Sequence, residues 1–359
     1  MPVQLLSVSM LTFDVSMPLM LLGVTVVSLL LSGRTEQKLK TTFEERAFKA
    51  RDAVLFVVLI TVAVSIIVFV PSYALLAVFL FSYSSLLFTF SLLFSNMSKR
   101  RAQVFFVFVG FAGLAAGVVA LVLGRGSLMF YGGLAALGLA AFAFVAALYE
   151  QFKAAVKTRW HLAATAPILF LLVFFLFMYQ KNTYLALVLL DVTGALFAVL
   201  ITLYLASLFT WKVTFIFAAL LTVMDIILVL VTGFMVTAAE HVAGIGLPVL
   251  ITLPTLPLIT TATGIRYLSL GLGDFFFAGT LATQTLKKYG RKVALVSALT
   301  MTLSFAAFEA ALLTTEFGAF PGTLMIIVGW LPVAGWKLFS ERKRKQSLPV
   351  EVSSQPPVV

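Results

Sequence analysis

The sequence predicts an all-α, polytopic membrane protein, because of its composition, its hydropathy and the spacing of its apolar runs. Of its 359 residues, 62% are hydrophobic and 11% are charged, whereas a soluble domain carries about 25% charged residues. The mean hydropathy is +1.11. Apolar runs of about 20 residues, the length of a helix that crosses a bilayer, recur along the chain. Helices are predicted in these runs because a lipid-exposed backbone must satisfy its own hydrogen bonds.

Eleven apolar runs are long enough to span a membrane, and we expect nine to eleven transmembrane helices. The runs cover approximately residues 8–32, 53–71, 73–95, 104–124, 128–149, 162–180, 183–209, 213–236, 266–286, 292–315 and 319–339. The count has a range because only Pro71-Ser72 separates the second run from the third. A proline can kink one long helix as well as end it.

The basic residues predict the orientation of these helices. They gather in alternate connections, at residues 34–51, 99–101, 153–159, 212, 287–292 and 337–345. By the positive-inside rule, we expect a multi-pass protein of the cell membrane with its C-terminus in the cytoplasm and the 237–265 connection outside. The net charge of +11 therefore sets topology, and we expect a lipid bilayer rather than nucleic acid as the partner of these residues.

We divide the chain into three parts. Residues 1–209 are expected to form N-terminal membrane helices, 210–340 a second membrane bundle, and 341–359 a disordered tail. Within the second part, residues 247–261 are apolar but contain three prolines and many β-branched residues, which are poor helix formers. We expect this segment to be extended or re-entrant and to lead into the span that follows.

Two aspartates lie inside apolar runs of the second part. Asp225 is surrounded by aliphatic residues, and Asp274 ends the string Leu270-Gly271-Leu272-Gly273-Asp274. An ionisable residue at bilayer depth costs several kcal/mol unless it faces a bundle interior or a wet cavity. Glycines beside a carboxyl allow another backbone to approach it. The two aspartates are therefore expected to share one polar site.

From these motifs, residues 213–336 resemble the presenilin and signal peptide peptidase family of intramembrane aspartyl proteases, in particular its archaeal members. In that family one span carries an aspartate after an aromatic residue, the next carries Gly-x-Gly-Asp, and the last opens with Pro-Ala-Leu. This chain has Met224 before Asp225, and Pro321-Gly322-Thr323 at the start of its final span. The chain thus keeps both aspartates and the proline, and departs from the family at the flanking residues.

The resemblance implies a presenilin-like bundle that cleaves transmembrane helices or signal peptides. It assigns catalysis to Asp225 and Asp274. Substrate binding is expected at Gly271, Leu272, Gly273, Pro321 and Gly322. The glycines and the Pro321-Gly322 turn would offer bare backbone to an extended substrate; the alternative is that they only allow close helix packing and kinks. The orientation predicted from charge is that of signal peptide peptidase rather than presenilin.

The chemistry expected of two close carboxyls needs neither metal nor organic cofactor. Like charges about 3 Å apart do not both ionise, so the pair shares one proton. The ionised carboxyl takes a proton from an attacking water, and the protonated one stabilises the developing oxyanion. A helical substrate must unwind first, and its extended backbone would pair with an exposed strand edge. The chain has no cysteine, which excludes disulfides and a thiol nucleophile.

Three further carboxyls lie near or inside apolar runs. Asp14 is expected to be solvated at a membrane edge. Asp191 would either line the same cavity or satisfy a local polar contact, and the structural role is favoured. Glu309 is expected to bond a neighbouring Thr or Ser. Two other functions remain open for the chain, a proton- or cation-coupled transporter that uses the aspartates as ion sites and a catalytically silent scaffold.

Overall fold

A computed structural model gives the fold for most of the chain. The structure describes residues 13–42, 48–70, 98–124, 126–152, 183–245, 250–261, 264–315 and 319–346, together with Leu87.

The described residues form ten α-helices, one π-helical segment and four short strands. The helices are α1 (Ser16–Thr42), α2 (Ala50–Phe69), α4 (Lys99–Leu123), α5 (Ser127–Phe152), α7 (Thr183–Leu208), α8 (Trp211–Ile226), α9 (Phe234–Ile245), α10 (Leu272–Tyr289), α11 (Arg291–Thr315) and α12 (Gly322–Gln346), and the π-helix is η2 (Ile227–Val231). The strands are β1 (Leu250–Pro254), β2 (Thr260–Thr261), β3 (Gly264–Ile265) and β4 (Tyr267–Gly271).

Seven of the described helical segments are long and apolar enough to cross a membrane. They are Ser16–Gly33, Ala50–Phe69, Lys99–Leu123, Met129–Tyr149, Trp211–Val231, Arg291–Thr315 and Gly322–Lys343. The protein is thus a mostly helical chain of the polytopic membrane class. Apart from Leu87, the predicted spans at 73–95 and 162–180 lie outside the described residues, so the count of nine to eleven stays a prediction.

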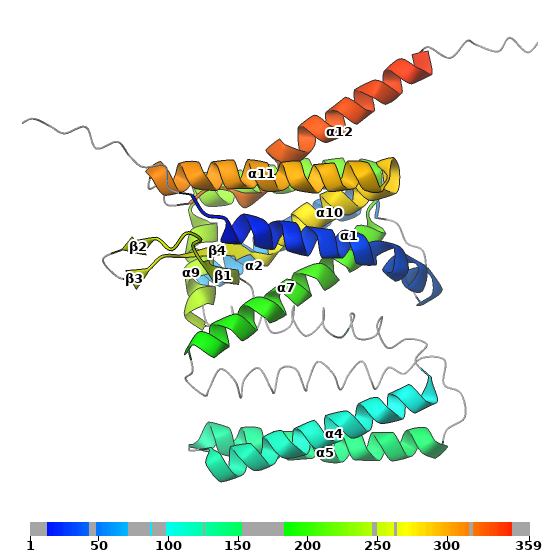
Figure 1. Cartoon of the computed structure of the whole chain (residues 1–359), viewed down its shortest axis with the longest axis vertical. Helices are drawn as coiled ribbons and strands as arrows, with labels where there is room; N and C mark the ends of the chain where they lie inside the picture. Colours follow the sequence, from blue (N-terminus) through cyan, green and yellow to red (C-terminus); the bar gives the residue numbers. More distant parts are fainter. Residues whose placement is uncertain are drawn as a thin grey trace, which may run out of the picture.

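Helix α10 lies at the centre of the bundle. All its residues from Phe275 to Thr285 are buried, and α1, α7, α8, α11 and α12 contact it (Figure 1). Because protein rather than lipid surrounds this helix, it does not need an unbroken apolar surface. Gln284 donates from Nε2 to the carbonyls of Ala206 at 2.7 Å and Phe209 at 2.9 Å, which ties α10 to the end of α7.

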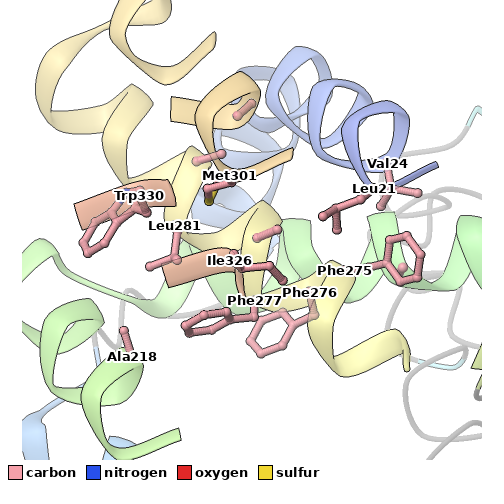
Figure 2. Close-up of a cluster of buried hydrophobic side chains, with 14 of the residues drawn as sticks. Leu21, Val24, Ala218, Phe275, Phe276, Phe277, Leu281, Met301, Ile326 and Trp330 are labelled. Atoms are coloured by element: carbon pink, nitrogen blue, oxygen red, sulfur yellow. The ribbon is translucent and has the colours of Figure 1, made fainter. Parts of the chain in front are cut away.

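One hydrophobic core joins the N-terminal helices to the later ones. Figure 2 shows Leu21 and Val24 of α1 near the phenylalanines of α10, with Trp330 of α12 on the other side. Trp330 is completely buried, and its Nε1 donates to Thr285 Oγ1 at 3.0 Å. The core therefore crosses the boundary at residue 209 that the sequence suggested.

Helices α4 and α5 form a separate pair. They pack closely against each other, and Figure 1 places them apart from the main bundle. Their interface is lined by small residues: a Cβ on Gly113 would lie 3.1 Å from the carbonyl oxygen of Ala136 and 3.3 Å from the Cβ of Ala140. Such close backbone approach is typical of helix pairs in membranes.

The helix that carries Asp225 ends differently from the prediction. The predicted span 213–236 is broken at Thr232-Gly233, where Gly233 has a φ of +68°, a conformation that favours glycine. A second helix, α9, follows and extends into the segment 237–265, which was predicted to be a connection between two spans. Hydropathy missed the break because the residues on both sides of it are apolar.

Two other boundaries are corrected. The predicted span 266–286 starts with β4, and its helix begins only at Leu272. Helix α12 continues to Gln346, so residues 341–346 are helical although they were assigned to a disordered tail. The basic residues at 337–345 form the last turns of this helix.

The extended conformation expected within 247–261 is confirmed for the described strands. Strand β1 pairs with β4 in antiparallel register, with Leu250 opposite Gly271 and Pro254 opposite Tyr267. The shorter strands β2 and β3 pair with each other in the segment that connects β1 to β4. The β1–β4 hairpin therefore delivers the chain directly into α10, three residues before Asp274.

Candidate active site

Asp225 lies in the last turn of α8, where the helix changes its winding. Asp225 is 9% exposed to solvent. The π-helix η2 begins two residues later, and the amide of Thr232 donates to the carbonyl of Ile227, five residues back, at 2.9 Å. Short π-helical segments cost helical regularity and are frequent at functional sites. The change in winding reorients the helix immediately beyond the aspartate.

Asp274 lies in the first turn of α10. Gly271 precedes the helix with φ −67° and ψ 144°, so the extended chain of β4 turns into the helix at this residue. A carboxyl in the first turn of a helix is favoured by the unpaired amides and the helix dipole. The Gly-x-Gly-Asp string is therefore a strand-to-helix junction with the aspartate at its helical end.

The N-terminus of α12 contacts both aspartates. Thr323 donates to Asp225 Oδ2 twice, from its amide at 3.2 Å and from its hydroxyl at 2.6 Å. The neighbouring Gly322 faces Asp274, since a Cβ added there would lie 2.5 Å from Asp274 Oδ1. Two consecutive residues of one helix thus contact both carboxyls, which places Asp225 and Asp274 at the same helix end.

Contacts with α11 fix the position of this helix end. Ser304 Oγ donates to the carbonyl of Met325 at 2.7 Å. Pro321 is buried, and its carbonyl accepts the first helical hydrogen bond, from the amide of Met325 at 3.3 Å. Because Pro321 has no amide hydrogen, the first donors of α12 begin at Gly322, next to the aspartates.

A cavity of about 430 Å³ opens between these elements. Asp225 and Asp274 line it, and so do the predicted substrate-binding residues Gly271, Leu272, Gly273 and Gly322. Its other polar side chains include Arg266, Ser269 and Glu309, and the remaining walls are mainly apolar residues of α1, α2, α9, α11 and α12. Pro321, which was also predicted to bind substrate, is buried and is not among the lining residues.

One edge of the β1–β4 hairpin is covered, and the other has no backbone partner among the described residues. The amide of Thr252 in β1 donates to Asp191 Oδ1 of α7 at 2.8 Å, so it points away from β4. Ser269 of β4 lies directly opposite Thr252. This is a non-hydrogen-bonded pair, in which the backbone amide and carbonyl of each residue point away from the other strand. By the same alternation, Tyr267, Ser269 and Gly271 direct their backbone groups to the outer edge of β4.

Asp14 holds the hairpin from the other end. It is 4% exposed, and its Oδ1 accepts the amide of Leu256 at 2.6 Å, while the amide of Val15 donates to the Leu256 carbonyl at 2.9 Å. The expectation that Asp14 is solvated is wrong, because Asp14 is buried. Its partner Leu256 lies 242 residues away in sequence, so local composition gives no sign of the contact. Asp191 has the structural role that was favoured for it.

Sequence reasoning missed Thr323, Arg266 and the environment of Glu309. A threonine near a helix start is too common to attract notice, although Thr323 follows Pro-Gly in an otherwise apolar segment. Glu309 was expected to bond a neighbouring Thr or Ser; its Oε2 is buried and has no hydrogen-bond partner among the described residues. Among the described residues, no three His, Asp or Glu side chains are grouped to hold a metal ion.

The Asp191–Thr252 bond predicts the behaviour of the hairpin. Replacing Asp191 with Leu leaves the Thr252 amide unpaired, which costs about 1–3 kcal/mol, so amide exchange in β1 should accelerate roughly ten- to a hundredfold. Asp191→Asn keeps an acceptor oxygen and should stay near wild type. Hydrogen–deuterium exchange with mass spectrometry measures both. Equal protection of β1 in the Leu and Asn variants would contradict the role assigned to Asp191.

No protein-family model matches this chain, and none of the curated proteins with which it was compared matches it either.

Proposed function

We propose that the protein is an intramembrane aspartyl protease that hydrolyses peptide bonds in transmembrane helices or signal peptides. The observation that carries this proposal is the meeting of Asp225 and Asp274 at the N-terminus of α12, on the wall of one cavity. The motif resemblance to presenilin and signal peptide peptidase supports it independently. The combination of Gly-x-Gly-Asp with a proline at the start of the final span favours a protease over a transporter, which does not require it; a silent scaffold is distinguished by the activity test below.

In the proposed reaction the two carboxyls share one proton. A water between them gives a proton to the ionised carboxyl and attacks the scissile carbonyl carbon, while the protonated carboxyl donates to the carbonyl oxygen. When the tetrahedral gem-diol collapses, the C–N bond breaks, one carboxyl passes its proton to the leaving nitrogen, and the other takes a proton from a hydroxyl of the gem-diol, which restores the shared proton. Acid and base belong to the pair rather than to one residue, because such groups titrate together.

Thr323 gives this pair its orientation. Its hydroxyl and amide both bind Asp225 Oδ2, which leaves the other oxygen of Asp225 for the water. Gly322 allows the Asp274 carboxyl to approach the same helix end, because any side chain there would occupy its space. Gly322 and Thr323 stand where the family has Ala-Leu. In this chain, the contacts of these two residues with the aspartates would serve in place of the family's residues.

The free edge of β4 suggests how a substrate binds. Residues 268–273 line the cavity, and Ser269 and Gly271 direct backbone groups outward just before Asp274. An unwound substrate segment would pair with this edge as a third strand, which brings its backbone carbonyls towards the aspartates. Asp191 and Asp14 fix the hairpin on its other side, so the free edge is held in place.

Replacing either aspartate with asparagine tests the proposal. Asp225→Asn and Asp274→Asn should each lower cleavage of a fluorogenic transmembrane peptide by more than about a hundredfold, because the shared proton is lost. Each variant should remain monodisperse, since a neutral amide adds no buried charge. The matched control is Glu240→Gln, an exposed carboxyl on α9, which should cleave like wild type. Substantial turnover in either Asn variant would reject the two-carboxyl mechanism.

Thr323 is expected to be a positioning residue. Thr323→Val keeps the shape and the amide but removes the hydroxyl bond to Asp225, and kcat should fall about tenfold or more, by the 1.5–3 kcal/mol that a hydrogen bond to a charged group contributes. KM should change little, because the hydroxyl contacts no substrate. Thr323→Ser should restore kcat. If Val and Ser variants have the same kcat, the hydroxyl has no such role.

We further propose that the β hairpin faces the outside and the end of α12 the cytoplasm. This follows from the basic residues at the cytoplasmic ends of the predicted spans. The chain has no cysteine, so Thr260→Cys in β2 and Arg342→Cys in α12 each give a single thiol at an exposed position. A membrane-impermeant maleimide on intact cells should label the first and not the second. The opposite labelling would reverse the proposed orientation and the class of accessible substrates.

A further inference from the structure

Glu309 differs from the other buried carboxyls of the described residues. Asp14, Asp191 and Asp225 each accept at least one backbone amide hydrogen bond. Glu309 is 7% exposed, and its Oε2 has no hydrogen-bond partner in the described part of the chain. A buried polar atom left unpaired costs about 1–3 kcal/mol. Burial of this unpaired oxygen therefore destabilises the isolated protein. A bound group that donates a hydrogen bond to it would remove that destabilisation.

The location of Glu309 indicates where that partner comes from. The residue lines the cavity that Asp225 and Asp274 also line, with Phe305 and Leu312 one turn away on the same helix. Arg266 lines the cavity too, but among the described residues no ion pair joins it to Glu309. A group that enters the cavity thus meets a buried carboxyl oxygen that has no hydrogen-bond partner among these residues.

We propose that Glu309 pairs with one basic side chain of the substrate and thereby selects it. This inference rests on the proposed protease function. An ammonium or guanidinium group supplies a hydrogen-bond donor and a compensating charge together, whereas a hydroxyl or amide supplies only the donor. The pairing is strong because water and counterions screen it little at this depth.

The rest of the cavity suits a lysine or arginine stem. Its walls are mainly apolar, with Val64, Val229 and Leu313 among them. Long basic side chains pack their methylene groups on apolar surface and extend the charged end to a polar partner. The substrate class is therefore an apolar membrane segment that carries one Lys or Arg near the cleaved bond. Such a residue is costly in lipid, and its transfer to Glu309 would favour binding.

The test uses peptides that differ at one position. A set of apolar 25-residue peptides carries a single Lys at successive positions, each matched by a peptide with norleucine there. Binding to the full chain in zwitterionic nanodiscs is measured by fluorescence anisotropy, with Asp274→Asn in every protein so that no peptide is consumed. At one or more positions the Lys peptide should bind about tenfold or more tightly than its norleucine partner, and Glu309→Gln should bring that ratio to about one.

Two controls keep the outcome decisive. Glu341→Gln changes a carboxyl at the far end of α12, outside the cavity, and should leave the ratio as it was. Glu309→Met tests an apolar replacement of similar size and should also remove the preference, so a folding defect peculiar to one variant does not decide the result. A preference for Lys that survives both Glu309 changes, or no preference at any position, overturns the proposal.

Cleavage by the protein with Asp274 intact separates this inference from the function on which it rests. If the peptides are cleaved without any Lys preference, the protease proposal stands and the role of Glu309 fails. If the Glu309-dependent preference is present in binding but no peptide is cleaved, the cationic site stands and the protease proposal fails.

Discussion

The arrangement of the site depends on the contact between the N-terminus of α12 and the two aspartates. Thr323 binds Asp225 through two hydrogen bonds, and Gly322 packs against the carboxyl of Asp274. These carboxyls belong to different helices, and a buried carboxyl without partners would destabilise each of them. The start of α12 supplies donors and space at the same point, so the two aspartates become one site rather than two isolated polar groups.

The rest of the fold holds this contact in position. Helix α10, which carries Asp274, is in contact with five other helices. Ser304 fixes the beginning of α12 against α11. On the other side of the cavity, Asp191 and Asp14 bind the β1–β4 hairpin. The outer edge of β4 has no backbone partner among the described residues, and we propose that the substrate pairs with it.

Sequence reasoning predicted the features that depend on local composition. Asp225 and Asp274 stand out because charges are rare in apolar spans, and prolines with β-branched residues marked the extended segment that contains β1. It missed features that depend on distant partners. The amide that binds Asp14 is on Leu256, and the hydroxyl that binds Asp225 is on Thr323, 98 residues away. Helix ends also escaped it, since the residues of β4 and of η2 are as apolar as the helices beside them.

The central claim is that Asp225 and Asp274 act as one proton-sharing pair, and difference infrared spectroscopy during a pH titration tests it most directly. Carboxyl bands report protonation without any substrate. If the pair shares a proton, wild type will show two linked steps, and Asp225→Asn or Asp274→Asn will leave one step at a pH that matches neither of the original two. The account would be contradicted if each variant simply lost one step and kept the other unchanged, because the two carboxyls would then titrate independently.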